Sequence, residues 1–319
     1  MITHDPRDGV GMPCTTIAAI QATPVFLDRD ATIDKIGALA KEAAASGAEL
    51  VVFPEAFVPT YPDWVWRTTP WGDGDWYARF ADQSVEVPGP ACEAIAAVAS
   101  EHHLYLAVGV NERDGGTIYN TLLYFGPDGT RLGKHRKLMP TGGERLAWGQ
   151  GDGSTLPVID TPFGRVGGLI CWENYMPLAR AAMYEQGVDI WLAPTWDNSD
   201  VWVASMQHIA KEGRCYVVGV NSCLRASDVP ESLPGRDEIY GDPDDWMSRG
   251  NTVIVAPGGK ILAGPISEQE GILYAEVDLE AVRDSRREFD VVGHYARPDI
   301  FELHVDERAK KPVTTQNTD

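Results

Sequence analysis

Short runs of consecutive apolar residues alternate with helical segments along most of the chain, and this alternation constrains the fold more than any other feature. The runs 17–21 and 50–53 have the length of buried strands, and between them apolar residues recur at helical spacing over 31–46. We expect Asp30 to cap the first turn of this helix and Gly47 to end it. The order strand, helix, strand is typical of a βαβ unit, so the chain is predicted to have an α/β fold.

The same alternation continues to the C-terminal third of the sequence. Further helices are expected at 91–101, 178–186 and 201–213, and further strands at 104–110, 118–124, 166–170, 190–193 and 216–220. Other segments are interpreted as an irregular loop (57–78), a turn (127–129), a surface excursion (224–247) and a closing hairpin (252–255 with 273–277). No shift in composition marks a boundary, so residues 1–319 are predicted to form a single domain. Its core would span about 16–302, with a polar, mobile tail from about 307.

Composition limits the classes of function that need to be considered. The formal net charge is −20, with acidic residues spread along the chain, so binding to a phosphate backbone is not expected. No segment approaches the roughly 20 apolar residues of a membrane helix, and Met1–Thr16 lacks a signal-peptide stretch. The five cysteines are odd in number and form no CxxC pair, which favours a reducing compartment. We therefore expect a cytoplasmic protein that binds neither nucleic acid nor membranes.

Cys171 is the first candidate for chemistry, because it follows the predicted strand 166–170 at a point where the chain turns. A residue at the end of a buried strand is held rigidly and can face a cleft. A cysteine thiolate is also a strong nucleophile toward sp and sp² carbon. An isolated cysteine is more often a buried structural thiol, and four cysteines keep that interpretation: Cys14, Cys92, Cys215 and Cys223.

Glu55 and Lys137 are candidates for the groups that would assist such a nucleophile. Glu55 follows the apolar run 50–53, and a carboxylate beside a buried strand end is partly desolvated, which raises its pKa and suits a general base. Lys137 lies in the basic cluster 134–137, which is followed at once by Pro140-Thr141-Gly142-Gly143-Glu144. Such clusters are usually solvated faces, but an ammonium group can also stabilise a negatively charged tetrahedral centre.

Three stretches together resemble the signatures of the nitrilase superfamily, in the order found in that family. They are Phe53-Pro54-Glu55-Ala56-Phe57, the run 134–145, and Cys171-Trp172-Glu173-Asn174. The segments 148–154, 193–195 and 293–299 support the likeness, and the last two resemble the nitrilase branch rather than the amidase branches. The resemblance covers about residues 16–302.

The resemblance implies an α-β-β-α sandwich that associates through dimers, which in this family often grow into spirals. It implies that Cys171 is the nucleophile, Glu55 the general base and Lys137 the group that supports the transition state. Glu144 matches a second glutamate that positions the lysine and assists proton transfer, and the backbone N–H of Trp172 is a candidate oxyanion donor. The implied reaction converts an organic nitrile to a carboxylic acid and ammonia through a thioimidate and a thioester. It needs no cofactor, and the seven histidines show no metal-binding spacing.

An aromatic-lined pocket is expected around these groups, because several of the ten tryptophans lie near the three signatures. Candidates for contact with a small-molecule nitrile are Tyr61, Trp64, Trp148, Trp172, Tyr175 and Trp196. Core packing is the alternative role for each of them, with even weight for Trp64 and Trp196. His208 and His294 are interpreted as structural or interface residues.

Several other functions remain open at this point. An amidase or carbamoyl-amide hydrolase on the same fold would use the same three groups, and a cyanide-processing enzyme would need only a minimal pocket. A non-catalytic binding module would have no need for Glu55, Lys137 and Cys171 together. Glutamine amidotransferases also use cysteine, but place it in a Gly-x-Cys-x-Gly turn that is not found around Cys171.

Overall fold

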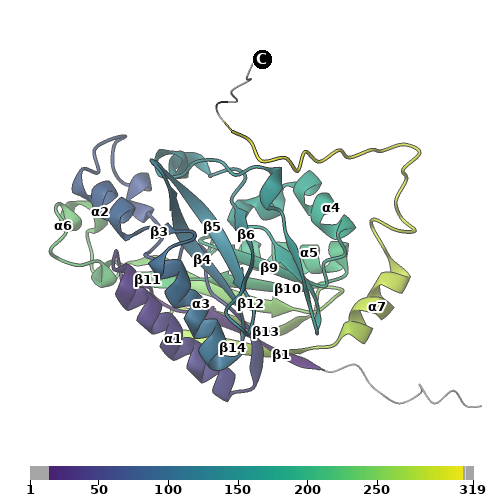
Figure 1. The fold of residues 1–319 in the computed structure, drawn as a ribbon. Coiled ribbons are helices and arrows are strands. Elements are labelled where there is room, and N and C mark those ends of the chain that lie inside the picture. The colour runs from purple at the N-terminus through teal and green to yellow at the C-terminus, as the bar shows by residue number, and fades with distance from the viewer. Residues whose placement is uncertain (1–13, 312, 314–319) are drawn as a thin grey trace, which may run out of the picture.

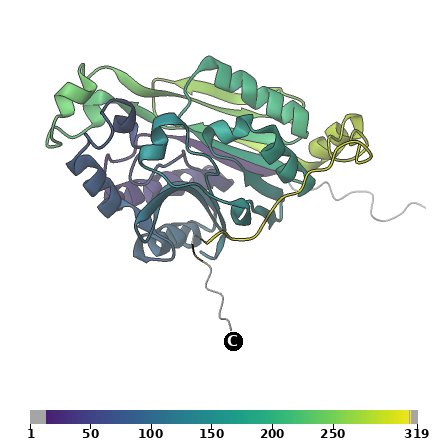
Figure 2. The same cartoon turned by 90° about the horizontal axis from the view of Figure 1, so that it is seen from above.

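The computed structural model describes residues 14–311 and 313, which form two mixed β-sheets between two layers of helices. Figure 2 shows the sheets stacked in the middle of the molecule, with helices on both outer sides. The predicted α-β-β-α sandwich is therefore confirmed. Each sheet contains seven strands within this part of the chain.

The first sheet has the strand order β14-β1-β2-β4-β5-β6, with β3 beside β4. Its strands are β1 (Thr15–Gln21), β2 (Ala48–Val52), β3 (Val85–Glu86), β4 (Tyr105–Asp114), β5 (Thr117–Phe125), β6 (Arg131–Arg136) and β14 (Gly271–Val277). β1, β2 and β4 are parallel neighbours, so β2 and β4 end at the same edge. β6 runs antiparallel to β5.

The second sheet has the strand order β11-β12-β10-β9-β8-β7, with β13 beside β12. Its strands are β7 (Val158–Thr161), β8 (Gly164–Gly168), β9 (Ile190–Thr195), β10 (Tyr216–Asn221), β11 (Cys223–Arg225), β12 (Trp246–Val255) and β13 (Ile261–Ser267). β8, β9 and β10 are parallel, and β9 and β10 are buried on both faces, which explains their continuous apolar character.

Helices cover the outer face of each sheet. The α-helices are α1 (Arg29–Ala45), α2 (Asp75–Gln83), α3 (Pro90–His102), α4 (Pro177–Glu185), α5 (Asp200–Gly213), α6 (Arg236–Tyr240) and α7 (Leu279–Glu288). The 3-10 turns are η1 (Asp63–Trp66), η2 (Gly142–Leu146), η3 (Gly153–Thr155), η4 (Cys171–Tyr175) and η5 (Ala226–Asp228). Helices α1 and α3 pack on the first sheet, and α4 and α5 on the second. The helices α2 and α6 lie together at one end of the sandwich (Figure 1).

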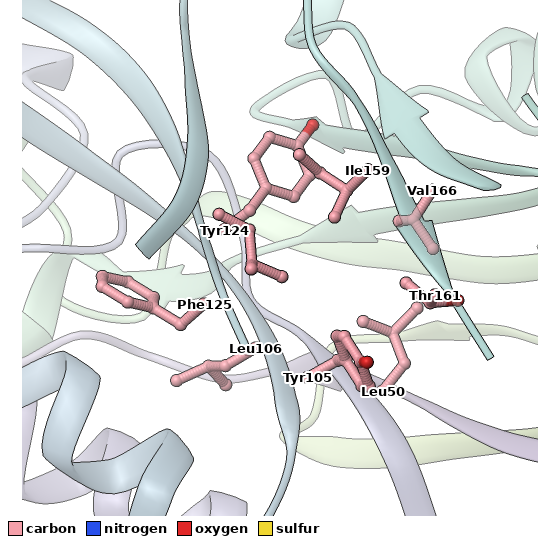
Figure 3. Close-up of a pocket in the computed structure, with 9 residues that line it drawn as sticks. Leu50, Tyr105, Leu106, Tyr124, Phe125, Ile159, Thr161 and Val166 are labelled. Carbon is pink, nitrogen blue, oxygen red and sulfur yellow. The ribbon is translucent and has the colours of Figure 1, made fainter. Parts of the chain in front are cut away.

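The space between the sheets is filled by apolar side chains from both inner faces, including Ile17, Leu122, Val166, Leu192 and Val218. One small gap of about 10 Å³ remains there. Figure 3 shows the residues that line it. Its walls include Leu50, Tyr105, Leu106, Tyr124, Phe125, Ile159, Thr161 and Val166. Such a volume is at the lower limit for a single water molecule, so the gap is a packing feature and offers no room for a substrate.

The structure corrects several expectations about local structure. The N-cap of α1 is Asp28 rather than Asp30, because its carboxylate accepts a hydrogen bond of 3.0 Å from the backbone N–H of Ala31. Gly47 does follow the helix, with a positive φ of 86°. The expected irregular loop 57–78 contains η1 and the start of α2 at Asp75.

Two further corrections concern the C-terminal half. The segment 224–247 is only partly a surface excursion: Leu224, Val229 and Leu233 are buried in an aromatic cluster. The expected hairpin is also wrong in its pairing, since β12 pairs with β13, and β14 pairs with β1 in the other sheet. Of the predicted tail, 312 and 314–319 lie outside the described residues, as does most of the N-terminal stretch 1–16. None of the helices in the described part of the chain is long and apolar enough to cross a membrane.

Candidate active site

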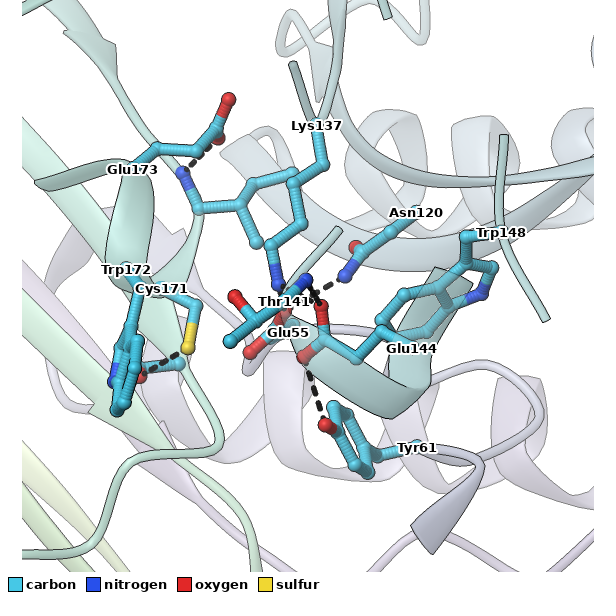
Figure 4. Close-up of polar contacts among 12 residues, drawn as sticks. Glu55, Tyr61, Asn120, Lys137, Thr141, Glu144, Trp148, Cys171, Trp172 and Glu173 are labelled. Atoms are coloured by element: carbon cyan, nitrogen blue, oxygen red, sulfur yellow. Dashed lines mark hydrogen bonds and ion pairs between the residues drawn. The ribbon is translucent and has the colours of Figure 1, made fainter. Parts of the chain in front are cut away.

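Three strand ends bring the predicted site residues together. Glu55 lies three residues beyond β2, Lys137 directly follows β6, and Cys171 lies three residues beyond β8 in the other sheet. Figure 4 shows their side chains directed toward one another, together with Glu144 from η2. The side chains of Glu55, Lys137 and Glu144 are at most 2% exposed. The structure therefore gathers all four predicted catalytic residues in one buried location.

Lys137 is the centre of this cluster. Its Nζ donates to Oε1 of Glu55 at 2.8 Å and to Oε2 of Glu144 at 2.7 Å. An ammonium group has three N–H donors, so one remains for another acceptor. Burial alone lowers the pKa of Lys137, but the charge of Glu55, that of Cys171 when its thiol is ionised, and that of Glu144 outweigh it and raise the pKa. Lys137 is therefore a permanent cation, and its Nζ also lies 5.4 Å from the ring centre of Trp148.

The two carboxylates that share Lys137 differ in how far they are satisfied. Oε1 of Glu55 also accepts from Nδ2 of Asn120 at 2.7 Å, but its Oε2 is buried without a hydrogen-bond partner among the described residues. Burial, opposed by Lys137 and reinforced by Glu144, raises the pKa of Glu55 to about 7. A carboxylate with a free oxygen and a pKa near neutrality can accept a proton.

Glu144, in contrast, has both oxygens engaged. Oε1 accepts from the hydroxyl of Tyr61 at 2.7 Å, and Oε2 accepts from Lys137 and from the backbone N–H of Thr141 at 2.6 Å. The bond to Thr141 is part of a capping box that begins η2. With both oxygens engaged, Glu144 is suited to hold Lys137 in place.

Cys171 has a backbone conformation that L-residues rarely adopt, with φ at +54°. Its Sγ accepts a hydrogen bond of 3.2 Å from the hydroxyl of Thr195, at the end of β9. Burial and the Glu55 charge raise the pKa of the thiol, while Lys137 opposes this shift. The sulfur is therefore protonated in the resting site and needs a base beside it in order to react.

The strained turn at Cys171 is held by Asn174. Its Nδ2 donates to the carbonyl oxygens of Leu169 and Cys171, both at 2.8 Å, while its Oδ1 accepts from Nε1 of Trp191 at 2.7 Å. A non-glycine residue at positive φ costs of order 1–3 kcal/mol, which such surrounding bonds must offset. These contacts fix the direction of the thiol.

A glycine on β4 allows Glu55 to approach the sheet. A Cβ atom at Gly109 would lie 2.1 Å from the carbonyl oxygen of Pro54 and 2.9 Å from the Cα of Glu55. Any side chain at this position would displace the segment that carries Glu55. Gly109 thus contributes to the site because it has no side chain and leaves room for the segment that carries Glu55.

The predicted pocket aromatics fall into two groups. Tyr61 and Trp148 are buried beside the charged cluster, and Trp196 stacks on Tyr61 with ring centres 4.4 Å apart. Trp172 is half exposed next to the nucleophile, and its Nε1 donates to Asp197.

The other two aromatics lie against different neighbours. The ring of Trp64 packs against Phe26, Trp76 and Phe80 in the apolar cluster. Tyr175 packs against Trp172, with ring centres 6.0 Å apart, and edge-on against Trp202. Trp64 therefore belongs to the apolar core, whereas Tyr175 lies beside Trp172, the neighbour of the nucleophile.

The remaining predicted residues lie elsewhere. His208 on α5 is exposed and 3.8 Å from Glu212, and His294 contacts the ring of Tyr295. Cys92, Cys215 and Cys223 are buried away from the cluster, and Cys14 is exposed. Within the described residues, no group of three or more histidine, cysteine or acidic side chains could hold a metal ion.

Sequence reasoning did not single out Asn120, Thr195, Asn174 or Gly109 as site residues. Thr195 and Asn174 did stand inside segments that carried the resemblance, so a signal for them existed. Asn120 and Gly109 lie within ordinary strand patterns. The role of a polar side chain or of a missing Cβ at these positions can be inferred only when the pairing of the strands is known.

The fold and the buried cluster define a class of hydrolases, and the comparisons with known proteins agree. A model of the carbon-nitrogen hydrolase family matches residues 16–287. The aliphatic nitrilase of Sinorhizobium fredii (strain HH103) is 50% identical over 305 residues, which cover 94% of this chain and 98% of that protein. Nitrilase 2 of Arabidopsis thaliana is 46% identical over 326 residues (98% and 94%). The bifunctional nitrilase/nitrile hydratase NIT4B of Nicotiana tabacum is 44% identical over 324 residues (98% and 92%).

Solved structures share the fold at lower identity. A carbon-nitrogen hydrolase from Helicobacter pylori G27 superposes with a TM-score of 0.71 at 22% identity, covering 91% of this chain and 97% of that one. Saccharomyces cerevisiae Nit3, a member of branch 10 of the nitrilase superfamily, gives a TM-score of 0.69 at 22% identity, covering 88% and 96%. The chain belongs to the carbon-nitrogen hydrolase family.

Proposed function

We propose that this protein is a nitrilase that hydrolyses an organic nitrile to the carboxylic acid and ammonia, with Cys171 as its nucleophile. One observation carries the proposal: a buried thiol shares a site with a carboxylate of raised pKa and a fixed ammonium group. Relatives named nitrilase, at 44–50% identity over nearly the whole chain, support the choice of a nitrile as substrate.

The first step forms a bond between sulfur and carbon. Glu55 takes the thiol proton of Cys171 as Sγ attacks the nitrile carbon. One π bond of the C≡N group breaks, and its electron pair becomes a lone pair on nitrogen. The remaining N–H of Lys137 faces this developing negative charge, and the backbone N–H of Trp172 is a second candidate donor. The nitrogen then takes the proton from Glu55, which gives a thioimidate.

Two molecules of water complete the reaction. The first adds to the thioimidate carbon with Glu55 as the base, and the tetrahedral intermediate expels ammonia to leave a thioester. The second attacks the thioester carbon, so that the C–S bond breaks, the acid leaves and the thiol recovers its proton. Lys137 and Glu144 keep their positions throughout, because their mutual hydrogen bond does not depend on the substrate.

Thr195 has a place in the same chemistry. Its hydroxyl accepts from the backbone N–H of Asp197 at 2.9 Å, which leaves the hydroxyl proton directed at Sγ of Cys171. A hydrogen bond to sulfur is stronger when the sulfur carries charge, so it stabilises the thiolate that forms during attack and departure. We therefore include Thr195 among the catalytic residues.

The substrate is proposed to be an apolar nitrile held among Tyr61, Trp148, Trp172 and Trp196. A panel of aromatic, arylaliphatic and aliphatic nitriles, each with its amide, tests this through ammonia release. Acid and ammonia from a nitrile support the proposal. Turnover of amides alone would instead identify an amidase, and formate or formamide from cyanide alone a cyanide-processing enzyme.

The relative from Nicotiana tabacum is named for two activities, nitrilase and nitrile hydratase. The tetrahedral intermediate can in principle lose sulfur instead of ammonia, which would release an amide. We propose the acid as the main product, and the same panel measures the ratio by chromatography of acid and amide.

We further propose that the protein forms homo-oligomers and resides in the cytoplasm. Exposed apolar side chains support the first part: Leu178 and Val201 on the outer helices are 67% and 70% exposed. The five cysteines are unpaired, which fits a reducing compartment. Sedimentation velocity and fractionation of cells test the two statements separately.

A further inference from the structure

The carboxylate of Glu173 is buried two residues after Cys171 and receives three hydrogen bonds. The backbone N–H of Ile170 donates to its Oε2 at 2.8 Å, and the backbone N–H of Leu138 donates to its Oε1 at 2.6 Å. The third partner is the ring Nε2 of His135, 2.9 Å from Oε2. Neither Glu173 nor His135 has an exposed side chain, so these bonds are shielded from water.

The two backbone donors are the chain neighbours of the reacting groups. Ile170 directly precedes Cys171 in the segment after β8 of the second sheet, and Leu138 directly follows Lys137 in the segment after β6 of the first sheet. The inner faces of the two sheets pack through side chains, and no β-ladder pairs β6 with β8. A single carboxylate therefore connects the nucleophile to the ammonium group across the interior of the sandwich.

The hydrogen bonds of His135 define the charge of its ring. Nδ1 lies 2.6 Å from the carbonyl oxygen of Thr155, which can only accept, so Nδ1 carries a proton. Nε2 faces the Glu173 carboxylate, whose two oxygens already accept backbone N–H groups and are thereby stabilised as an anion. A ring that donates from both nitrogens is an imidazolium.

We propose that His135 is held as an imidazolium cation and, through the Glu173 carboxylate, fixes the position of Cys171 relative to Lys137. His135 and Glu173 are thus positioning residues, and their effect on turnover rests on the function proposed above. The pair acts on the separation between nucleophile and ammonium group and leaves the bulk of the substrate pocket untouched.

The surroundings contain few other charges. Burial alone lowers the pKa of His135, but Glu173 and the Thr155 carbonyl outweigh it and raise the pKa above its ordinary value. From β5, the phenol of Tyr124 faces the pair, and burial together with the Glu173 charge keeps it neutral by raising its pKa. Lys134 and Arg136 on β6 pair with Glu112 instead. The contribution of the raised pKa is therefore fully present below the ordinary pKa of histidine and is lost as pH rises through the raised pKa of His135.

Glu173→Gln breaks this arrangement with almost no change in volume. An amide keeps one acceptor oxygen and replaces the other with two donors, so an N–H group must face another N–H at Ile170 or Leu138. The amide also carries no negative charge, so the imidazolium loses the anion that stabilises it and His135 is expected to become neutral. We expect kcat to fall about 100-fold through displacement of the nucleophile, with KM changed about threefold or less.

Glu112→Gln is the matched control. Glu112 is also a buried carboxylate with several donors, but its partners Lys134 and Arg136 point away from the site. It contacts neither Ile170 nor Leu138, so the control should lower the melting temperature and leave kcat within about twofold of the parent. A kcat for Glu173→Gln within twofold of the parent, or a loss equal to that of Glu112→Gln, would overturn the positioning role.

The charge of His135 is measured independently of turnover. In the full-length protein labelled with ¹⁵N-histidine, both ring nitrogens of His135, assigned with His135→Gln, should show imidazolium shifts at pH 7.5, and Glu173→Gln should convert them to those of a neutral ring. Neutral shifts in the parent would overturn the proposal even if nitriles are hydrolysed. Imidazolium shifts in a protein that hydrolyses no nitrile would leave the ion pair standing and remove only the proposed function.

Discussion

Glu55 and Glu112 are two buried glutamates whose cationic partners are alternate side chains of one stretch of chain. Their pKa values are shifted in opposite directions. Glu112 accepts hydrogen bonds from Lys134, Arg136 and the hydroxyl of Thr121. Burial alone raises the pKa of Glu112, but these bonds outweigh it and lower the pKa. Glu55 shares the single cation Lys137 with a second carboxylate, and its pKa is raised to about 7.

The difference shows how a protein separates a structural carboxylate from a reactive one. At Glu112 two cations bind one buried carboxylate, although Arg136 also pairs with the exposed Asp114, and both oxygens of Glu112 are satisfied, so its charge is stable at every ordinary pH. At Glu55 one cation is divided between two anions, and one oxygen is left without a partner among the described residues. Incomplete compensation is what makes a buried carboxylate ready to take a proton.

The largest effect is expected at Cys171, the nucleophile, which distinguishes the cluster around Glu55 from the cluster around Glu112. Cys171→Ala should reduce turnover by about 10⁵-fold, because no other described side chain in the cluster can form the covalent adduct. Ammonia release measures this, and circular dichroism should show an intact fold. Cys215→Ala, a buried thiol remote from the cluster, is the control and should retain turnover. Activity of Cys171→Ala equal to that of the parent would eliminate the mechanism.

Exchanging each glutamate for glutamine tests the comparison directly. Glu55→Gln should lower kcat by about 10³-fold, since an amide cannot accept the thiol proton. Glu112→Gln should leave kcat nearly unchanged but lower the free energy of unfolding by about 1–3 kcal/mol, because the partly buried Lys134 and Arg136 lose a buried charged partner. Kinetics and urea denaturation of both variants provide the four measurements. The reverse pattern would show that the roles have been assigned to the wrong carboxylates.

Lys137→Arg probes whether one cation at a fixed point is needed. Arginine keeps the charge but has a planar, longer head group that cannot match the positions of Glu55 and Glu144 together with the substrate nitrogen. We expect kcat to fall about 100-fold. A rate close to that of the parent would mean that Lys137 contributes only its charge.

The pH dependence should follow Glu55 and not Glu112. Because Glu55 must be ionised to act as a base, kcat/KM should fall about tenfold per unit below an apparent pKa near 7. The sign for stability is opposite: a raised pKa favours the protonated folded state, so this contribution is lost as pH rises from 4.5 to about 7. Glu112, with its lowered pKa, contributes stability that is lost only as pH falls below its ordinary range. A rate profile that is flat from pH 5 to 8 would contradict the assignment of Glu55.

The smallest effect is expected at Thr195. Thr195→Val removes the hydroxyl with little change in shape and should lower kcat about tenfold, the value of one hydrogen bond to a charged sulfur. The rate of Cys171 alkylation by iodoacetamide should fall as well, and Thr195→Ser should restore most of both rates. Equal rates for the valine variant and the parent would restrict Thr195 to a structural role.

Much of this site could be anticipated from local sequence. Glu55 and Cys171 each follow an apolar run that predicts a buried strand, Lys137 lies in the basic cluster 134–137, and the motifs around all three indicated the family. The partners of these residues could not be anticipated in the same way. Asn120 lies in mid-strand, and its role depends on β6 ending beside β5, where the backbone N–H of Lys137 meets the Asn120 carbonyl.

Sequence by itself determined the class of fold and the chemical groups, since hydrophobic periodicity and residue type are properties of short segments. Only the tertiary structure decided that β14 returns to pair with β1, that 224–247 closes over an aromatic cluster, and that Trp64 belongs to the core. It also decided which of two buried glutamates is reactive. The physical reason is that pKa and hydrogen-bond satisfaction depend on groups distant in sequence, and these meet only when the two sheets are packed together.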